Sequence, residues 1–172
     1  MGIRSLLSNI LVAAGDAATQ TLLKNILDGQ GKLLPATRAR QALGLARSRR
    51  VDVAVLELGL PGSNGLSLLR ELLELQPDME IICLTGDGNV HDAVEAMKIG
   101  ANDYVSTPIE PGRLLQVVAG ATQKAALRRE ARRQKSFSSV EDMVIGDSPG
   151  MKQVRYLLEK VAPTDVPVLL HG

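Results

Sequence analysis

The stretch VDVAVLELGLPGSNGLSLLREL, residues 51–72, places a short apolar run, one carboxylate and a turn directly before a helical pattern. The β-branched and aliphatic residues within 52–57 predict a buried strand. This strand closes on Glu57, and a Gly-Leu-Pro-Gly turn follows it. Apolar residues then recur at helical spacing, at Leu66, Leu69, Leu72 and Leu73. The stretch therefore predicts a strand–turn–helix unit that brings one acid to the end of a buried strand.

The same alternation of short aliphatic runs and helical patterns recurs over the first 125 residues. We expect strands near 9–14, 31–35, 52–57, 80–84 and 102–106. The first predicted helix follows Asp16, which is suited to be its N-cap, and the fifth predicted helix begins after Pro111. Three predicted apolar helix faces are Leu22, Leu23, Ile26 and Leu27; Val90, Ala93, Val94 and Met97; and Leu114, Leu115, Val118 and Ala121. Strands that alternate with helices predict an α/β fold with a doubly wound parallel sheet.

Composition excludes several classes of function. The only aromatic residues are Tyr104, Phe137 and Tyr156, so base stacking on nucleic acid is not expected. Lys and Arg (20) nearly balance Asp and Glu (19), which argues against a global field that attracts DNA, RNA or an anionic membrane. The single cysteine, Cys83, excludes an intramolecular disulfide and is expected in the core. No signal-peptide pattern or membrane-length apolar span is present, so we expect a cytoplasmic protein.

In an open parallel sheet, ligands bind at the carboxyl ends of the strands. Few of the residues expected there carry a charge. They are Ala14, Gly15 and Asp16 after the first strand, Glu57 after the third, Thr85 after the fourth and Thr107 after the fifth. Metal-dependent phosphoryl chemistry needs several carboxylates and a cation. Because only Asp16 could join Glu57 and no Lys or Arg stands among these residues, neither a metal site nor magnesium is expected. His91 and His171 also lack partners at metal-ligand spacing.

Residues 8–125 resemble the receiver domain of bacterial two-component response regulators. Four ordered motifs carry the resemblance: NILVAAGD (9–16), the opening stretch (51–72), IICLTGDG (81–88) and AMKIGANDYVSTPIEPGRLL (96–115). It implies a flavodoxin-like fold with strand order 2-1-3-4-5.

The resemblance also assigns roles to single positions, and most of these carry unexpected residues. The family's phosphate-accepting aspartate falls on Glu57, its paired magnesium-binding acids fall on Ala14 and Gly15, and its lysine falls on Thr107. Only the switch positions, the hydroxyl of Thr85 and the aromatic ring of Tyr104, match the family in type. Asp16 lies one place after the acidic pair and does not restore it, although it is a possible minor acidic neighbour.

The sequence leaves three interpretations of Glu57 open. The acid can be part of a packed site that no longer responds to a signal, a permanent imitation of a phosphorylated aspartate acting on Thr85, or the wall of a pocket for another ligand. A working phosphoacceptor with unusual residues is the alternative from a different class, and it is disfavoured because the longer side chain displaces the nucleophile.

The C-terminal part carries a second resemblance. After a basic helical linker at 126–140, residues 141–172 resemble the entry to the AAA+ domain of sigma-54-dependent activators of the nitrogen-regulator type. Gly172 aligns with the first glycine of the phosphate-binding loop, so an ATP site is not expected in these residues.

These features predict a regulatory module and not an enzyme. We expect a homodimer through about 88–135, while Leu114, Val118, Ala121 and Ala125 suit either a helical pair or packing on the sheet. In a full-length regulator, the resemblance implies sigma-54 RNA polymerase and DNA as partners. Residues 1–172 themselves are expected to bind neither nucleic acid nor a membrane.

Overall fold

The structure, a computed structural model, describes residues 8–62, 64–86 and 90–143, with side chains described as far as Arg132. The chain divides into two compact units, residues 1–128 and 129–172. Of the segment 141–172, which resembles the start of an AAA+ domain, residues 141–143 end the last described helix, and residues 144–172, with His171 and Gly172, lie outside the described residues. The following account concerns the first unit and the helix that leaves it.

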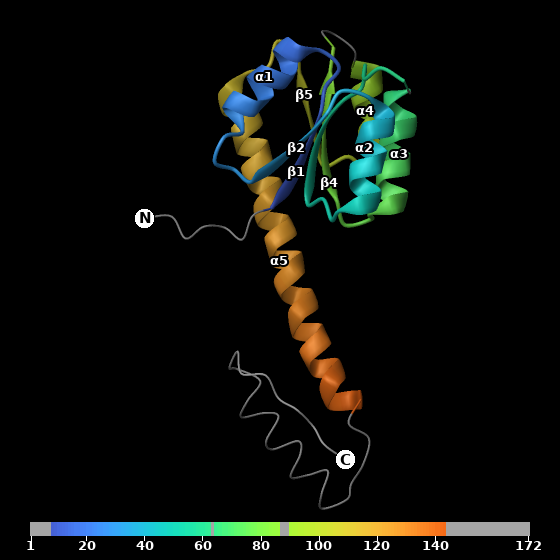
Figure 1. Cartoon of the computed structure of the whole chain (residues 1–172), viewed down its shortest axis with the longest axis vertical. Coiled ribbons are helices and arrows are strands. Elements are labelled where there is room, and N and C mark those ends of the chain that lie inside the picture. The colour runs from blue at the N-terminus through green and yellow to red at the C-terminus, as the bar shows by residue number, and fades with distance from the viewer. Residues whose placement is uncertain (1–7, 63, 87–89, 144–172) are drawn as a thin grey trace, which may run out of the picture. The chain divides into compact units, whose positions relative to one another are not determined.

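Five strands and five helices alternate along the described chain (Figure 1). The strands are β1 (Asn9–Ala13), β2 (Lys32–Ala36), β3 (Val53–Glu57), β4 (Glu80–Thr85) and β5 (Asp103–Ser106). The helices are α1 (Ala17–Ile26), α2 (Ala39–Ser48), α3 (Gly65–Leu75), α4 (Val90–Ile99) and α5 (Pro111–Met143). All strand pairs are parallel, in the order β2-β1-β3-β4-β5. The predicted fold class and strand order are therefore confirmed.

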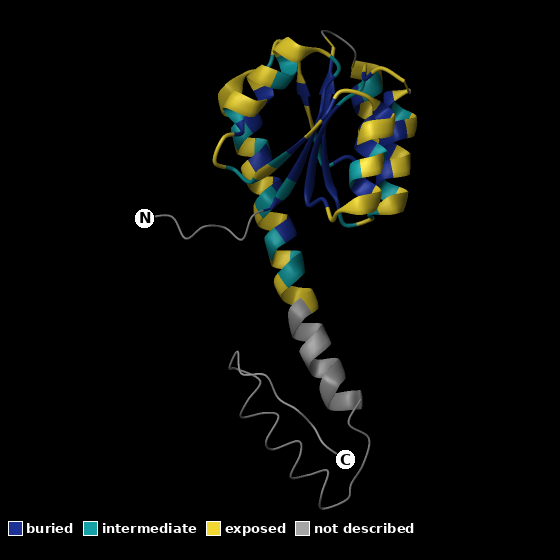
Figure 2. Cartoon of the chain, in the orientation of Figure 1, coloured by how far each residue is buried: buried dark blue, intermediate teal, exposed yellow. Residues whose placement is uncertain are grey.

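Both faces of the sheet are covered by helices, which explains why its strands are almost continuously apolar (Figure 2). Helices α1 and α5 lie on one face, and α2, α3 and α4 lie on the other. Successive residues of a strand point to opposite faces, so Ile10 and Val12 belong to the core under α1 and α5, whereas Leu11 and Ala13 belong to the other core. Cys83 is fully buried in the second core, as predicted.

The helix starts follow local chemistry that the sequence shows. Asp16 is the N-cap of α1, and its carboxylate accepts a hydrogen bond from the backbone N–H of Thr19 at 2.8 Å. The Asn64 side chain caps α3 in the same way. At Gly65 the helix passes so close to Leu58 that a Cβ would lie 2.6 Å from the Leu58 carbonyl carbon. Glycine at this position therefore lets α3 begin directly after the turn that follows β3.

The edge strand β2 contains Pro35, which pairs with Val12 of β1 in the parallel ladder. Proline has no backbone N–H and is tolerated in a sheet where that side of the strand has no neighbour. The opposite edge, β5, is only four residues long.

Two of the predicted apolar helix faces are wrong in detail. In α4 the buried residues are Ala93 and Ala96, while Val90, Val94 and Met97 are exposed. In α1 Leu23 and Leu27 are buried, but Leu22 is exposed. The reason is that both helices carry apolar residues on more than one side, so spacing alone does not choose the buried side.

Helix α5 resolves the two interpretations of its apolar stripe. Leu114, Val118 and Ala121 pack in the core beneath α1 and α5, and Ala125 is also buried. The stripe therefore packs on the sheet and is not available to pair with a second helix. None of the helices in the described part of the chain combines the length and apolar character needed to cross a membrane.

Candidate functional site at the carboxyl edge of the sheet

The predicted acid lies where the sequence placed it, at the last position of β3, and it is partly buried. The backbone N–H of Gly15 donates a hydrogen bond of 2.7 Å to Oε2 of Glu57. This contact joins the end of β3 to the loop between β1 and α1. The structure therefore brings Glu57 and Gly15 together, as their resemblance to site positions implied.

Ala14 and its loop are held by backbone hydrogen bonds. Ala14 is fully buried, and its N–H donates to the Ala36 carbonyl at 3.1 Å. The Gln20 side-chain amide donates to three carbonyl oxygens, those of Val12 (3.1 Å), Ala14 (3.0 Å) and Ala36 (2.7 Å). Gln20 thus ties the ends of β1 and β2 together beneath the site. No sequence pattern predicts this role, because a Gln in the first turns of a helix carries no signal of its own.

Pro61 closes the space above Gly15. A Cβ at position 15 would lie 2.6 Å from Cδ of Pro61, a separation that real side chains do not adopt. The same Cβ would lie 3.7 Å from Oε2 of Glu57. An acidic side chain at position 15 therefore needs Pro61 to move. Pro61 belongs to the predicted turn after the strand at 52–57, and no pattern in the sequence indicated this contact.

Thr85 and Thr107 form the other half of the edge. Thr85 is the last residue of β4 and is buried. Thr107 follows β5, and both its N–H (2.9 Å) and its hydroxyl (3.3 Å) donate to the Thr85 carbonyl oxygen. The two threonines are therefore adjacent, and Thr107 braces the backbone at the end of β4.

The remaining two predicted site residues do not join this group in the described structure. The Asp16 carboxylate caps α1, and its hydrogen bonds with Thr19 hold the pKa of this group below its ordinary value. Tyr104 is 42% exposed on β5.

Magnesium is the metal that the receiver resemblance implies for this edge of the sheet. Magnesium is held in proteins by carboxylates and other oxygen ligands at short, near-octahedral distances. Ala14 and Gly15 supply no side-chain oxygen, and one Glu57 oxygen already accepts the Gly15 N–H. Among the described side chains, those of residues 8–62, 64–86 and 90–132, no three His, Cys, Asp or Glu gather as a metal site requires. These residues do not fit the ion.

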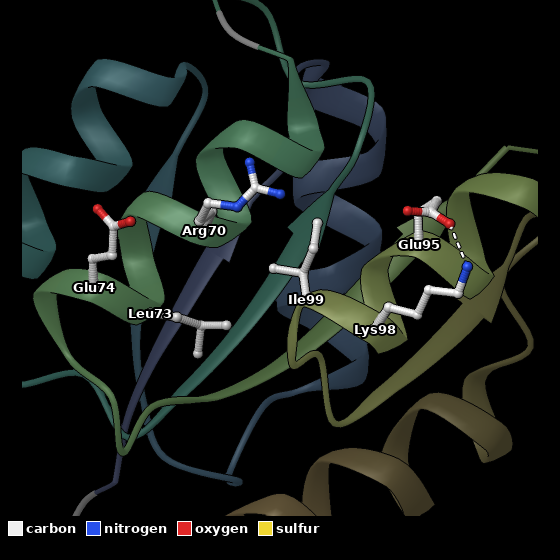
Figure 3. Close-up of a pocket in the computed structure, with 6 residues that line it drawn as sticks. All are labelled: Arg70, Leu73, Glu74, Glu95, Lys98 and Ile99. Carbon is white, nitrogen blue, oxygen red and sulfur yellow. Dashed lines mark hydrogen bonds and ion pairs between the residues drawn. The ribbon is translucent and has the colours of Figure 1, made fainter.

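A hollow of about 560 Å³ borders this group at Gly15 and Pro61 and includes Arg38 at the start of α2. Another, of about 500 Å³, lies away from the group, between the C-terminal halves of α3 and α4 (Figure 3). Its charged lining residues are Arg70, Glu74, Glu95 and Lys98, of which Lys98 donates to Glu95 at 2.8 Å. Two acids and two bases offer no net charge that selects an anion or a cation.

The fold and this edge define a class of protein. A five-stranded parallel sheet in the order 2-1-3-4-5, with an acid ending β3 and hydroxyls at β4 and after β5, is the architecture of signal-receiving domains of the flavodoxin-like type. Residues 10–119 match the family model of the response regulator receiver domain. The chain belongs to this family.

Among curated proteins, transcriptional regulators are similar to the chain. It is 34% identical to the C4-dicarboxylate transport transcriptional regulatory protein DctD of Rhizobium meliloti over 137 residues. This alignment covers 78% of the present chain and 30% of DctD. It is 31% identical over 167 residues to the nitrogen assimilation regulatory protein NtrX of Azorhizobium caulinodans, covering 95% and 37%. The chain thus spans about a third of the length of these relatives.

Solved structures agree. NtrX from Brucella abortus in complex with ADP superposes with a TM-score of 0.67 at 31% identity, over 92% of this chain and 35% of that one. A receiver domain protein from Methanospirillum hungatei superposes with a TM-score of 0.66 at 26% identity, over 71% of this chain and 98% of that one. The predicted receiver family is confirmed.

Proposed function

We propose that this receiver domain regulates through protein contacts, without enzymatic activity and without accepting a phosphoryl group. The observation that carries the proposal is the hydrogen bond from the Gly15 N–H to the Glu57 carboxylate. In this arrangement one acid is satisfied by a backbone amide, at the edge where a phosphotransfer site needs several acids and a cation.

Crowding supports the proposal independently of the missing charges. Pro61 occupies the space that a side chain at position 15 would need. Phosphoryl transfer depends on positioning the nucleophile, the metal and the phosphoryl oxygens together. A site in which Pro61 crowds the Cβ position of residue 15 does not regain this arrangement by a change of one residue.

The Glu57 contact also bears on how the acid acts. An imitation of a phosphorylated aspartate would work by drawing Thr85 toward the acid, whereas the hydrogen bond of Glu57 in the described residues runs to Gly15. We therefore favour a packed site in which Glu57 fixes the β1–α1 loop, over a permanent imitation of the activated state.

The phosphotransfer alternative is tested by incubating the protein with acetyl phosphate and magnesium and measuring its intact mass. We expect no gain of a phosphoryl group, and no magnesium-dependent spectral change with beryllofluoride. A stoichiometric gain that disappears in the Glu57→Gln variant would overturn the proposal, because it would make Glu57 a working acceptor.

The choice between packing and imitation is tested with Glu57→Gln and Glu57→Asp. If Glu57 only packs, Glu57→Gln keeps an oxygen that accepts from Gly15, and the strength of self-association should stay within about twofold of the wild type. If the charge imitates phosphorylation, Glu57→Gln should shift self-association strongly. Sedimentation velocity over a concentration series distinguishes the two results.

Self-association through about 88–135 is part of the proposal. Four exposed large apolar side chains support this surface: Val90, Val94 and Met97 on α4 and Tyr104 on β5. Exposed apolar groups that gather on neighbouring elements are typical of interaction surfaces. We call these four residues the α4–β5 patch.

The wider role follows from resemblance. We propose that the domain belongs to a cytoplasmic sigma-54-dependent regulator, in which it controls assembly of an AAA+ ATPase through linker 126–140. Several relatives named as transcriptional regulatory proteins align over 95% of the chain, which includes the segment beyond the receiver domain. RNA polymerase and DNA would be partners of the longer protein.

A small-molecule sensor is the second candidate, and the hollow beside Gly15 and Pro61 is the observation in its favour. Arg38 at its rim provides a cation for an anionic ligand. A thermal-shift screen with nucleotides, including cyclic dinucleotides, tests this candidate. A saturable shift that Arg38→Gln abolishes would favour sensing over the contact-based function.

A further inference from the structure

At the amino edge of the sheet, opposite Glu57, a buried acid meets two cations from α5. Glu80 is the first residue of β4, and its side chain is only 1% exposed. Lys124 donates to Glu80 Oε2 at 3.0 Å, and Arg128 Nη1 lies 2.6 Å from Glu80 Oε1, in ion-pair contact but outside hydrogen-bond alignment. Arg128 also donates to the Asp78 carbonyl at 3.2 Å, before β4 begins.

These contacts come where the apolar attachment of α5 to the sheet ends. The buried residues of α5 are Leu114, Val118, Ala121 and Ala125, and from 126 to 132 none is buried. Lys124 and Arg128 are one helical turn apart, so both reach the same carboxylate. Next to the end of this apolar attachment, Lys124 and Arg128 therefore hold α5 to β4 through ionic contacts.

Hydrophobic packing would serve stability alone at least as well. Burying a carboxylate costs free energy that its partners must offset, and a well-packed apolar residue is often equal or better. The ion pairs add a geometric constraint, because Glu80 can pair only with cations on the side of α5 that faces it. In addition, β4 is buried throughout and carries Glu80 at one end and Thr85 at the other.

We propose that Glu80, Lys124 and Arg128 form an ionic clamp that fixes where α5 leaves the receiver domain. Glu80 is a positioning residue in this device. The clamp does not depend on whether Glu57 accepts a phosphoryl group or on whether the α4–β5 patch binds a second copy.

Hydrogen–deuterium exchange of the whole chain tests the clamp. In the Glu80→Gln variant we expect amides of 122–132 to exchange about tenfold faster, while amides of 112–118 and of β1 and β3 keep their wild-type rates. The control is Glu71→Gln, which removes an exposed acid from α3 and should leave α5 unchanged.

A second variant covers the case in which Glu80→Gln impairs folding. Arg128→Gln leaves Glu80 its ion pair with Lys124, so the domain should fold, and faster exchange should be confined to α5 after Ala125. Unchanged exchange at 126–132 in both variants would overturn the proposal. Uniformly faster exchange across the strands in Arg128→Gln would overturn it too, because the ion pairs would then serve general stability and not the exit of α5.

Discussion

At the scale of single residues, the most informative position of the candidate site is one without a side chain. Gly15 donates its N–H to Glu57 and leaves no room for a Cβ beneath Pro61. The sequence alone showed that Ala14 and Gly15 stand where the family has acids. It could not show that a proline from a separate turn fills the space, because that contact joins residues far apart along the chain.

The Gly15–Pro61 contact predicts that Gly15→Ala destabilises the domain by about 1–3 kcal/mol, the cost of overpacking a closed site. Chemical denaturation measures this change. Gly59→Ala is the matched control from the turn after β3, where an added Cβ meets nothing within 4 Å, and its effect should stay within about 0.5 kcal/mol. Equal effects of the two variants would contradict the crowding at Gly15.

Cys83 gives a prediction that depends on pH. Burial raises the pKa of its thiol from 9.0 to about 12, so the folded protein should not react with a thiol reagent at pH 8. Because the unfolded chain loses the proton at lower pH than the folded one, the thiol's contribution to stability is complete below about pH 9 and lost as the pH rises toward about 12.

Labelling of Cys83 with a thiol reagent at about pH 8, with and without denaturant, checks the expected lack of reaction in the folded protein. Rapid labelling of the native protein would contradict it.

At the scale of elements, Gln20 shows how one side chain aligns two strands. Its amide donates to carbonyls of β1, β2 and the loop that leads to the site. The sequence predicted α1 and its N-cap but not this bridge, since hydrogen bonds to distant carbonyls leave no periodic pattern.

Replacing Gln20 by Glu would set an acceptor against three carbonyl acceptors. We expect a loss of about 2 kcal/mol or more, because the three carbonyls lose the Gln20 amide as a donor and meet an added carboxylate in a partly buried site, although the Ala36 carbonyl still accepts from the Ala14 N–H. Thermal unfolding measures the loss. Gln123→Glu, an exposed change on α5, is the control and should be close to neutral.

The positions of strands and helices along the chain were easier to predict than the side that each helix buries. Strand bounds from the sequence agree with the structure to within about one residue, because short aliphatic runs between turns have few alternatives. In α4, by contrast, alanines face the core and the larger Val90, Val94 and Met97 face outward. Hydrophobicity alone favours the larger residues for the core, so it selects the wrong side of α4.

At the scale of the whole molecule, this reversal concentrates apolar surface on the α4–β5 patch. The exposed positions are spaced by three and four residues on α4, and Tyr104 of the neighbouring strand extends them. The stripe on α5, which the sequence left open as a pairing surface, packs on the sheet instead.

The patch predicts that Val94→Glu weakens self-association at least about tenfold, because a charge in an apolar contact must be desolvated without a partner. Leu22→Glu is the matched control, since Leu22 is a similarly exposed apolar residue on α1 (41% against 46%). Sedimentation velocity over a concentration series measures both variants. A wild type that remains monomeric at all concentrations, or equal weakening by both variants, would contradict an interface at the patch.

The two edges of the sheet restrict how a second copy could attach. An exposed edge strand invites backbone pairing with another chain, and proteins limit this hazard with proline and with short edge strands. Here Pro35 interrupts the donors of β2, and β5 offers only four residues. Extension of the sheet from one molecule into the next is therefore disfavoured at both ends. A second copy would therefore bind through surface side chains. Such side chains can be replaced during evolution without creating an exposed strand edge that promotes aggregation.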